Sequence, residues 1–142
     1  MIDPMLLADA PEPFESNKHI AELKIDGIRG ILDIQEQVKL YTRHRNDVSY
    51  RYQEITQAAK EAADRGTILD GEFVVSDIDT GKPDFEATMA RFSSNPKLGI
   101  ERTPGLTFVA FDILQHKGQD LTSLDLMARK EILEEAVTKT KL

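Results

Sequence analysis

The chain has 142 residues, of which 40% are hydrophobic and 30% charged, and its net charge is −7. This length fits one domain, and this composition supports a packed core rather than a disordered chain. The acidic balance excludes a protein coated in basic side chains for nucleic acid, and the lack of cysteine excludes disulfides and thiolate metal sites. Because the sequence has neither a membrane-length apolar run nor a secretory signal, we expect a cytoplasmic protein with no membrane partner.

The first part of the chain is expected to be a lead-in followed by strands. Prolines and the lack of periodicity indicate an extended segment over residues 1–18. Apolar residues then predict a strand from His19 to Asp26. Two more strands are predicted at 28–34 and 38–42, joined by the polar turn 35–37, so that the three would form an antiparallel meander.

A helix is expected next. Asp47 or Ser49 is suited to cap it, helical spacing of apolar residues carries it to about Arg65, and Gly66 is a natural stop. The carboxylates of this helix, at Glu54, Glu61 and Asp64, are expected on solvated faces.

Two strong strands dominate the rest of the chain, at 67–75 and 106–114. Between them we expect a turn, a short helix opened by Pro83 and a loop from about Ser93. Ser123 is suited to cap a final helix reaching residue 141, with its apolar residues mostly inward at Leu126, Ile132, Leu133 and Val137. This mixture without strict alternation predicts an α+β fold, with antiparallel sheets and flanking helices.

Lys24 is the first candidate for chemistry. In a strand, residues two apart share a face, so Glu22, Lys24 and Asp26 would point together while Leu23 and Ile25 face the core. A surface lysine between carboxylates is one reading of this pattern, and a nucleophile is the other. A nucleophilic lysine must lose its proton, and neighbouring carboxylates raise its pKa, so a working site would need a compensating cation.

Two later stretches could supply partners. Glu72 lies inside an apolar strand, where a carboxylate must be exposed, paired or bound to a ligand. It shares strand parity with Asp70, and Gly71 leaves room beside it. Phe111 and Asp112 are adjacent in a strand and should face opposite ways, with Phe111 either in the core or in a cleft where it could stack on a planar base.

Four short segments together resemble a known family. Lys24-Ile25-Asp26-Gly27-Ile28-Arg29 resembles the Lys-x-Asp-Gly-x-Arg signature of ATP-dependent DNA ligases and related covalent nucleotidyltransferases, including mRNA capping enzymes. Thr42-Arg43 resembles the family's Ser-Arg motif, Asp70-Gly71-Glu72 its Asp-Gly-Glu motif, and Phe108 through Leu114 the motif that ends in Phe-Asp-Ile-Leu. The resemblance covers nearly the whole chain.

The resemblance implies part of the nucleotidyltransferase fold of DNA ligases and mRNA capping enzymes, which is ATP-grasp-like. It also implies that a lysine attacks the α-phosphate of ATP, releases pyrophosphate and forms lysyl-AMP. AMP then passes to the 5′-phosphate of nicked double-stranded DNA, and the 3′-hydroxyl displaces it. The implied roles are DNA repair, replication and recombination.

Site residues follow from the same resemblance, motif by motif. Lys24 would be the adenylated nucleophile, and Glu22 would accept a hydrogen bond from the adenine amino group. Arg29 and Glu72 would hold the ribose, with Glu72 also near Mg²⁺. Phe111 would stack on adenine, and Arg43 would contact the 5′-phosphate of the nick. Leu23, next to the nucleophile, completes the expected nucleotide-binding set.

The chain departs from the family after Leu114. The later Glu-Gly strand and Lys-x-Lys strand have no match, and Lys139-Thr140-Lys141 is taken as a chance resemblance. We therefore expect residues 1–142 to be one incomplete adenylation domain without an oligonucleotide-binding barrel. Weak or absent self-adenylation is expected, because the absent lysines would lower the pKa of the nucleophile, and an open sheet edge predicts self-association.

Three alternatives to a DNA ligase fragment remain. The first is an RNA ligase and the second a capping-type guanylyltransferase. A carboxylate at Glu22 favours adenine over guanine, because it accepts from an exocyclic amine and would meet a carbonyl in guanine. The third is a truncated nucleotide-binding module without catalytic activity.

Overall fold

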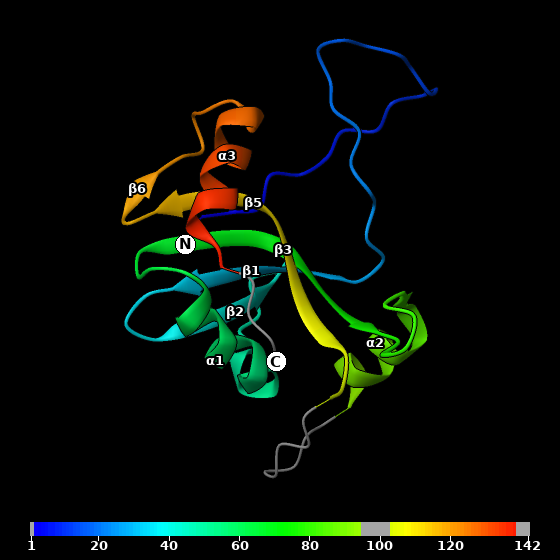
Figure 1. Cartoon of the computed structure of the whole chain (residues 1–142), viewed down its shortest axis with the longest axis vertical. Coiled ribbons are helices and arrows are strands. Elements are labelled where there is room, and N and C mark those ends of the chain that lie inside the picture. Colours follow the sequence, from blue (N-terminus) through cyan, green and yellow to red (C-terminus); the bar gives the residue numbers. More distant parts are fainter. Residues whose placement is uncertain (1, 95–102, 139–142) are drawn as a thin grey trace.

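One sheet organises the protein. The computed structural model describes residues 2–94 and 103–138, and within them the strands follow the order β2-β1-β3-β5-β6, with β4 paired to β3 (Figure 1). Every pairing is antiparallel. The strands are β1 (Ile28–Ile34), β2 (Val38–Thr42), β3 (Thr67–Ser76), β4 (Pro83–Asp84), β5 (Leu106–His116) and β6 (Gln119–Asp120).

Helices flank this sheet, so the predicted α+β class is confirmed. They are the 3-10 turn η1 (Ser49–Arg51) and the α-helices α1 (Gln53–Ala62), α2 (Phe85–Ser93) and α3 (Leu126–Ala136). α1 and α3 lie on the same face of the sheet, where both contribute to one hydrophobic cluster, α1 over β2 and α3 over β5, and α2 lies beyond the end of β3 (Figure 1). Among the described residues, no helix has the length and apolar character needed to span a membrane.

Strand alternation divides the apolar residues between two clusters. The larger cluster contains Leu32, Leu40, Phe73 and Ile113 from the sheet and is completed by residues of η1, α1, α2 and α3. The smaller cluster, Ile31, Ile68 and Leu114, is covered by Ile2 and Met5 of the lead-in. The face of the sheet opposite the main core therefore lies partly beneath the N-terminal segment.

The predicted strand from His19 to Asp26 is wrong. These residues lie in the irregular lead-in that precedes β1, and Leu23, expected in the core, is 94% exposed. The predicted meander would put them beside β1, but β1 already pairs with β2 on one side and with β3 on the other. Apolar residues alone do not make a strand when no neighbouring strand can accept its hydrogen bonds.

The helix boundaries also differ from those expected. Asp47 lies before η1 and Ser49 is its first residue, so neither caps α1, which begins at Gln53 and ends at Ala62. α2 begins at Phe85 rather than at Pro83, which lies in β4, and Asp84 caps it by accepting from Ala87 N at 2.9 Å. Asp125 rather than Ser123 caps α3, which ends at Ala136. Most of the predicted loop after Ser93, and the expected end of the last helix at 139–141, lie outside the described residues.

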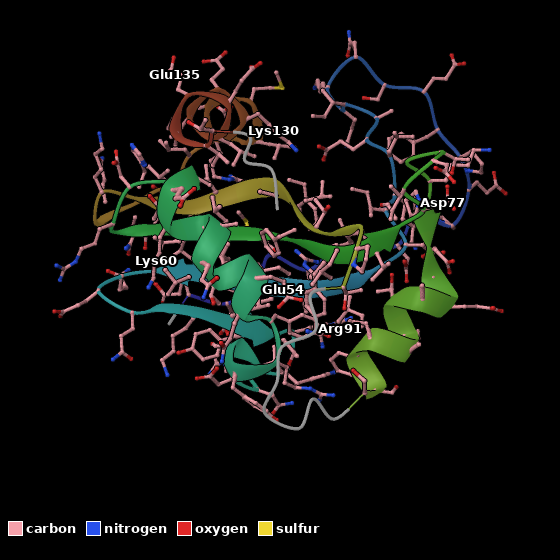
Figure 2. All side chains as sticks on the ribbon, turned by 60° about the horizontal axis from the view of Figure 1, so that its bottom comes forward. Glu54, Lys60, Asp77, Arg91, Lys130 and Glu135 are labelled. Carbon is pink, nitrogen blue, oxygen red and sulfur yellow. The ribbon has the colours of Figure 1, made fainter. Side chains whose placement is uncertain are left out.

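Glu54 is not on a solvated face. Its carboxylate is buried and accepts from Arg91 at 3.2 Å, so an ion pair joins α1 to α2 (Figure 2). The Arg91 guanidinium also lies over the ring of Tyr52, 4.7 Å from its centroid. Glu61 and Asp64 are exposed as predicted. The prediction of solvent-exposed carboxylates therefore holds only where no residue of α2 covers α1.

Candidate functional site

A hydrogen bond attaches the Lys24 segment to β3. The Gly27 amide donates to Glu72 Oε2 at 2.8 Å. A β-carbon at residue 27 would lie 2.3 Å from Val74 Cγ1 and 2.8 Å from Phe73 O, so only glycine fits without displacing the segment. The Lys24 motif and the Asp70-Gly71-Glu72 motif, 45 residues apart at this hydrogen bond, are thereby brought into contact.

Lys24 is a solvent-exposed ammonium in this arrangement. Its Nζ donates to Asp26 Oδ1 at 2.9 Å, and its side chain is 83% exposed. The hydrogen bond and the charge of Asp26 raise the pKa of Lys24, and the charge of Glu72 adds to the shift. Since a lysine attacks only as the free amine, this environment opposes the chemistry until cations or a bound substrate change it.

Arg29 occupies the centre of the same face. It donates to both oxygens of Asp70, at 3.0 and 2.7 Å, and its Nη2 also donates to Met5 O at 2.7 Å. Burial raises the pKa of Asp70, and the hydrogen bonds from Arg29 oppose that shift. The guanidinium carbon lies 5.3 Å from the centroid of the Phe111 ring, within the range of a cation–π contact. The sequence predicted Arg29 and Phe111 for one site, and the structure brings them together.

An irregularity in β5 changes how Phe111 is presented. Asp70 pairs with Asp112 and Gly71 with Ala110, so Phe111 is an extra residue without a Cα partner on β3. The expectation that Phe111 and Asp112 face opposite ways is therefore wrong. A β-bulge interrupts the alternation and lets the Phe111 ring reach Arg29 while Asp112 stays opposite Asp70.

Helix α3 contributes two cations that the sequence analysis missed. Arg129 donates to both oxygens of the buried Asp112, at 2.8 and 2.9 Å. Lys130 Nζ donates to Glu22 Oε1 and to Phe111 O. The available signal was a pair of adjacent cations on a helix that otherwise carries Glu131, Glu134 and Glu135. α3 thus holds β5 and the lead-in in one arrangement.

The remaining predicted residues have different positions. Glu22 reaches the site through Lys130, whereas Leu23 is almost fully exposed. Arg43 is exposed just after β2, which pairs with β1 up to Thr42 opposite Gly30. Arg43 itself lies in a turn, which the hydrogen bond from Arg45 N to Thr42 O closes at 2.9 Å.

Among the site residues, Glu72 is the carboxylate best suited to bind a metal ion together with a phosphate ligand. Burial raises its pKa, and the hydrogen bond from Gly27 opposes the shift. The described residues contain no group of three or more metal-binding side chains. Mg²⁺ commonly binds one or two carboxylates together with substrate phosphates and water. The residues therefore fit a magnesium ion shared with a phosphate ligand, not an all-protein metal cage.

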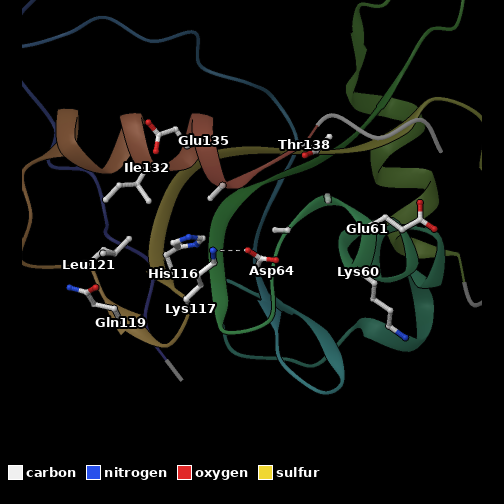
Figure 3. Close-up of a pocket in the computed structure, with 13 residues that line it drawn as sticks. Lys60, Glu61, Asp64, His116, Lys117, Gln119, Leu121, Ile132, Glu135 and Thr138 are labelled. Carbon is white, nitrogen blue, oxygen red and sulfur yellow. Dashed lines mark ion pairs between the residues drawn. The ribbon is translucent and has the colours of Figure 1, made fainter.

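A cavity of about 530 Å³ lies elsewhere, between the end of α1, the β5–β6 turn and α3 (Figure 3). Its lining mixes cations, carboxylates and apolar side chains, and Lys117 is ion-paired with Asp64 at its mouth, at 3.1 Å. None of the sequence-predicted site residues lines it. The candidate site is thus the open face around Lys24, Arg29, Glu72 and Phe111.

Comparisons with known proteins identify the family of the chain. The family model described as the ATP dependent DNA ligase domain matches residues 4–142. The SPbeta prophage-derived DNA ligase-like protein LigB of Bacillus subtilis is 40% identical over 133 residues, which are 93% of this chain and 46% of LigB. A DNA ligase of Pyrobaculum calidifontis is 34% identical over 83% of this chain and 21% of its own length.

Solved structures give the same result. The ligase domain of LigD from M. tuberculosis superposes with a TM-score of 0.66 at 30% identity, over 80% of this chain and 35% of that one. Mycobacterial DNA ligase D complexed with ATP and MES gives a TM-score of 0.64 at 27% identity, over 82% of this chain and 36% of that one. The chain thus spans about half of LigB and smaller shares of the other proteins. By sequence and by fold, it belongs to the ATP-dependent DNA ligase domain family.

Proposed function

We propose that this chain is the nucleotide-binding part of a ligase adenylation domain and that Lys24 is the residue that accepts AMP from ATP. The observation that carries the proposal is the Gly27–Glu72 hydrogen bond, at 2.8 Å. It joins the lysine motif to the Asp-Gly-Glu strand on the face that also carries Arg29 and Phe111. The similarity to mycobacterial DNA ligase D complexed with ATP and MES supports a nucleotide as the ligand.

The proposed step forms one bond and breaks one. Lys24, as the free amine, attacks the α-phosphorus, and the bond to the bridging oxygen breaks, so that pyrophosphate leaves with the electron pair. Two protons pass to solvent, one when the ammonium becomes the free amine and one from the nitrogen after it has bonded to phosphorus. Phe111 would stack on the adenine, and Arg29 and Glu72 would hold the ribose hydroxyls. Glu22 would accept from the adenine amino group, with Leu23 beside it.

Mg²⁺, when bound with the triphosphate, supplies positive charge that lowers the pKa of Lys24 and stabilises the leaving pyrophosphate. Glu72 is the residue proposed to contact it. In the longer parent enzyme, Arg43 would bind the 5′-phosphate of nicked double-stranded DNA through its fork of donors. Nick sealing of this kind would serve repair, replication or recombination in the cytoplasm.

A second candidate function is nucleotide binding without AMP transfer. It is favoured by the environment of Lys24, whose exposed ammonium faces Asp26 and Glu72. This candidate predicts ATP affinity without a covalent product, whereas the first predicts a covalent product, formed slowly, at Lys24. An RNA ligase or capping-type relative would differ in the nucleic acid or the nucleotide that it prefers.

Calorimetric titration of the chain with ATP and Mg²⁺ tests the proposed site. Phe111→Leu keeps an apolar side chain but removes the stacking ring, and Glu72→Gln keeps an acceptor for the Gly27 amide but removes the charge. We expect each to weaken ATP binding by about tenfold, as for the loss of one stacking or charged contact. Phe14→Leu, which changes an exposed ring of the lead-in, is the matched control and should leave the affinity unchanged. Unaltered affinity in both site variants would refute the assignment.

A further inference from the structure

Lys130 connects two residues that the proposed function assigns to adenine. It projects from α3 near β5 (Figure 2), and its Nζ donates to Glu22 Oε1 and to the carbonyl oxygen of Phe111. Its side chain is 21% exposed and that of Glu22 47%, so the contact is partly shielded from water. One ammonium therefore holds both the carboxylate and the backbone of the stacking residue.

This contact matters because Glu22 belongs to a segment without regular secondary structure. Residues 19–26 are outside any helix or strand, and Leu23 is almost fully exposed, so their own packing does little to fix the carboxylate. α3, in contrast, is held firmly to β5 by the two hydrogen bonds from Arg129 to Asp112. Lys130 extends that anchorage to the lead-in.

The two carboxylate oxygens of Glu22 have different surroundings. Oε1 accepts from Lys130, and among the described residues no hydrogen bond reaches Oε2. An exocyclic amine can donate to Oε2, whereas a carbonyl at the same place would be repelled by it. The Lys130 ammonium further offsets the negative charge of Glu22, which would otherwise disfavour a triphosphate nearby.

We propose that Lys130 is a positioning residue that fixes Glu22 and Phe111 and thereby sets the preference for adenine over guanine nucleotides. This inference rests on the proposed function, because it assigns Lys130 a part in the same nucleotide site. Without the ammonium, Glu22 moves freely with the lead-in. The hydrogen bond from the adenine amine to Glu22 then becomes weaker, and so does the repulsion between Glu22 and the guanine carbonyl.

Equilibrium titration of the whole chain with ATP and with GTP tests this inference. We expect wild type to prefer ATP and Lys130→Met to lower that preference by about tenfold, the size of one charged hydrogen bond. Lys130→Arg keeps a cation and should recover most of the preference. Lys60→Met removes an exposed lysine of α1 and is the matched control, which should behave as wild type. In a Glu22→Gln background, Lys130→Met should change the preference little further, because the two residues act through one contact.

The outcomes separate the two proposals. If wild type binds neither nucleotide, the proposed function fails and this inference falls with it. If wild type prefers ATP and folded Lys130→Met keeps the full preference, the proposed function stands and this inference is overturned. Equal binding of ATP and GTP by wild type would also overturn it. A fall in thermal midpoint with unchanged nucleotide preference would assign Lys130 a purely structural role and refute the proposal.

Discussion

Gly71→Ala should strongly destabilise the protein, because β3 and β5 approach too closely for a β-carbon. The added carbon would lie 2.4 Å from Val109 O and 2.7 Å from the Phe108 ring, where ordinary contacts are 3.4–4 Å. Relief needs a movement of roughly 1 Å between two hydrogen-bonded strands, since a backbone carbonyl cannot rotate away as a side chain does. Overpacking of a core typically costs about 1–3 kcal/mol, and we expect about 3 kcal/mol here.

Gly30→Ala is the matched control. Gly30 is the Cα partner of Gly71 on β1, and neither glycine has a positive φ. Its added carbon would lie 3.1–3.2 Å from side-chain atoms of Leu40 and Phe73, which can adjust. Alanine also lowers the conformational entropy of the unfolded chain, which stabilises the protein by about 0.4–1 kcal/mol. The net change in the free energy of unfolding should therefore stay within about 1 kcal/mol.

Urea unfolding followed by circular dichroism measures both variants. With a dependence on urea of about 1–3 kcal/mol per molar, a difference of about 2–3 kcal/mol lowers the midpoint of Gly71→Ala by roughly 1 M relative to Gly30→Ala. Equal midpoints would refute the close approach of β3 and β5 at this point, and with it the reason given for glycine in the Asp-Gly-Glu motif.

Three further predictions concern the lead-in, α3, and Tyr52 between η1 and α1. Gly27→Ala should weaken ATP binding at least tenfold in calorimetry while lowering the urea midpoint less than Gly71→Ala, because its clash separates the lead-in from β3 without opening the sheet; tight ATP binding would contradict this. Arg129→Met should lower the free energy of unfolding by about 3–5 kcal/mol, because it leaves the buried Asp112 carboxylate unpaired; a loss below about 1 kcal/mol would mean that water reaches it. Burial raises the pKa of Tyr52 to about 12, so the phenol stays neutral in the folded state above its unfolded value of 10.0, and stability falls as the pH rises from about 10 to 12. That loss, about 2 kcal/mol by urea titration at pH 9 and 11.5, should be largely absent in Tyr52→Phe, and an equal loss in both proteins would exclude Tyr52 as its source.

The sequence predicted the central strands well because their signals are local. Apolar and β-branched residues over 28–34 and 38–42 gave the bounds that β1 and β2 have. The strand predicted at 67–75 became β3 with one more residue, and the strand at 106–114 became β5 with two more. In these segments local preference and tertiary pairing agree.

Three of the failures share one physical cause, since each depends on a partner distant in sequence. His19–Asp26 has strand-like residues but no strand to pair with. Glu54 is buried because Arg91, 37 residues later, covers it. The bulge at Phe111 arises from the register of β5 against β3 and breaks the alternation assumed from sequence. The strand and helix periodicities of apolar residues, two and 3.6 residues, contain no information about these contacts.

The candidate site was predicted through its motifs rather than through periodicity. Lys24, Arg29, Glu72 and Phe111 came from short signatures, and the structure places them around one face through the Gly27 and Asp70 hydrogen bonds. Lys130 carries no motif of its own. Its contact with Glu22 spans 108 residues and depends on how α3 packs on β5, so only the folded chain reveals it.

The identity of the residue that takes AMP is the central claim, and the intact mass of the protein tests it most directly. The chain is incubated with Mg²⁺ and ATP labelled at the α-phosphate, beside Lys24→Ala and the control Lys18→Ala, which removes another exposed lysine of the lead-in. We expect a gain of one AMP at an occupancy well below one per chain. That gain should be retained in Lys18→Ala, absent in Lys24→Ala, and mapped to the peptide containing Lys24. An adduct that persists in Lys24→Ala, or a chain that binds ATP and never acquires the label, would contradict the account.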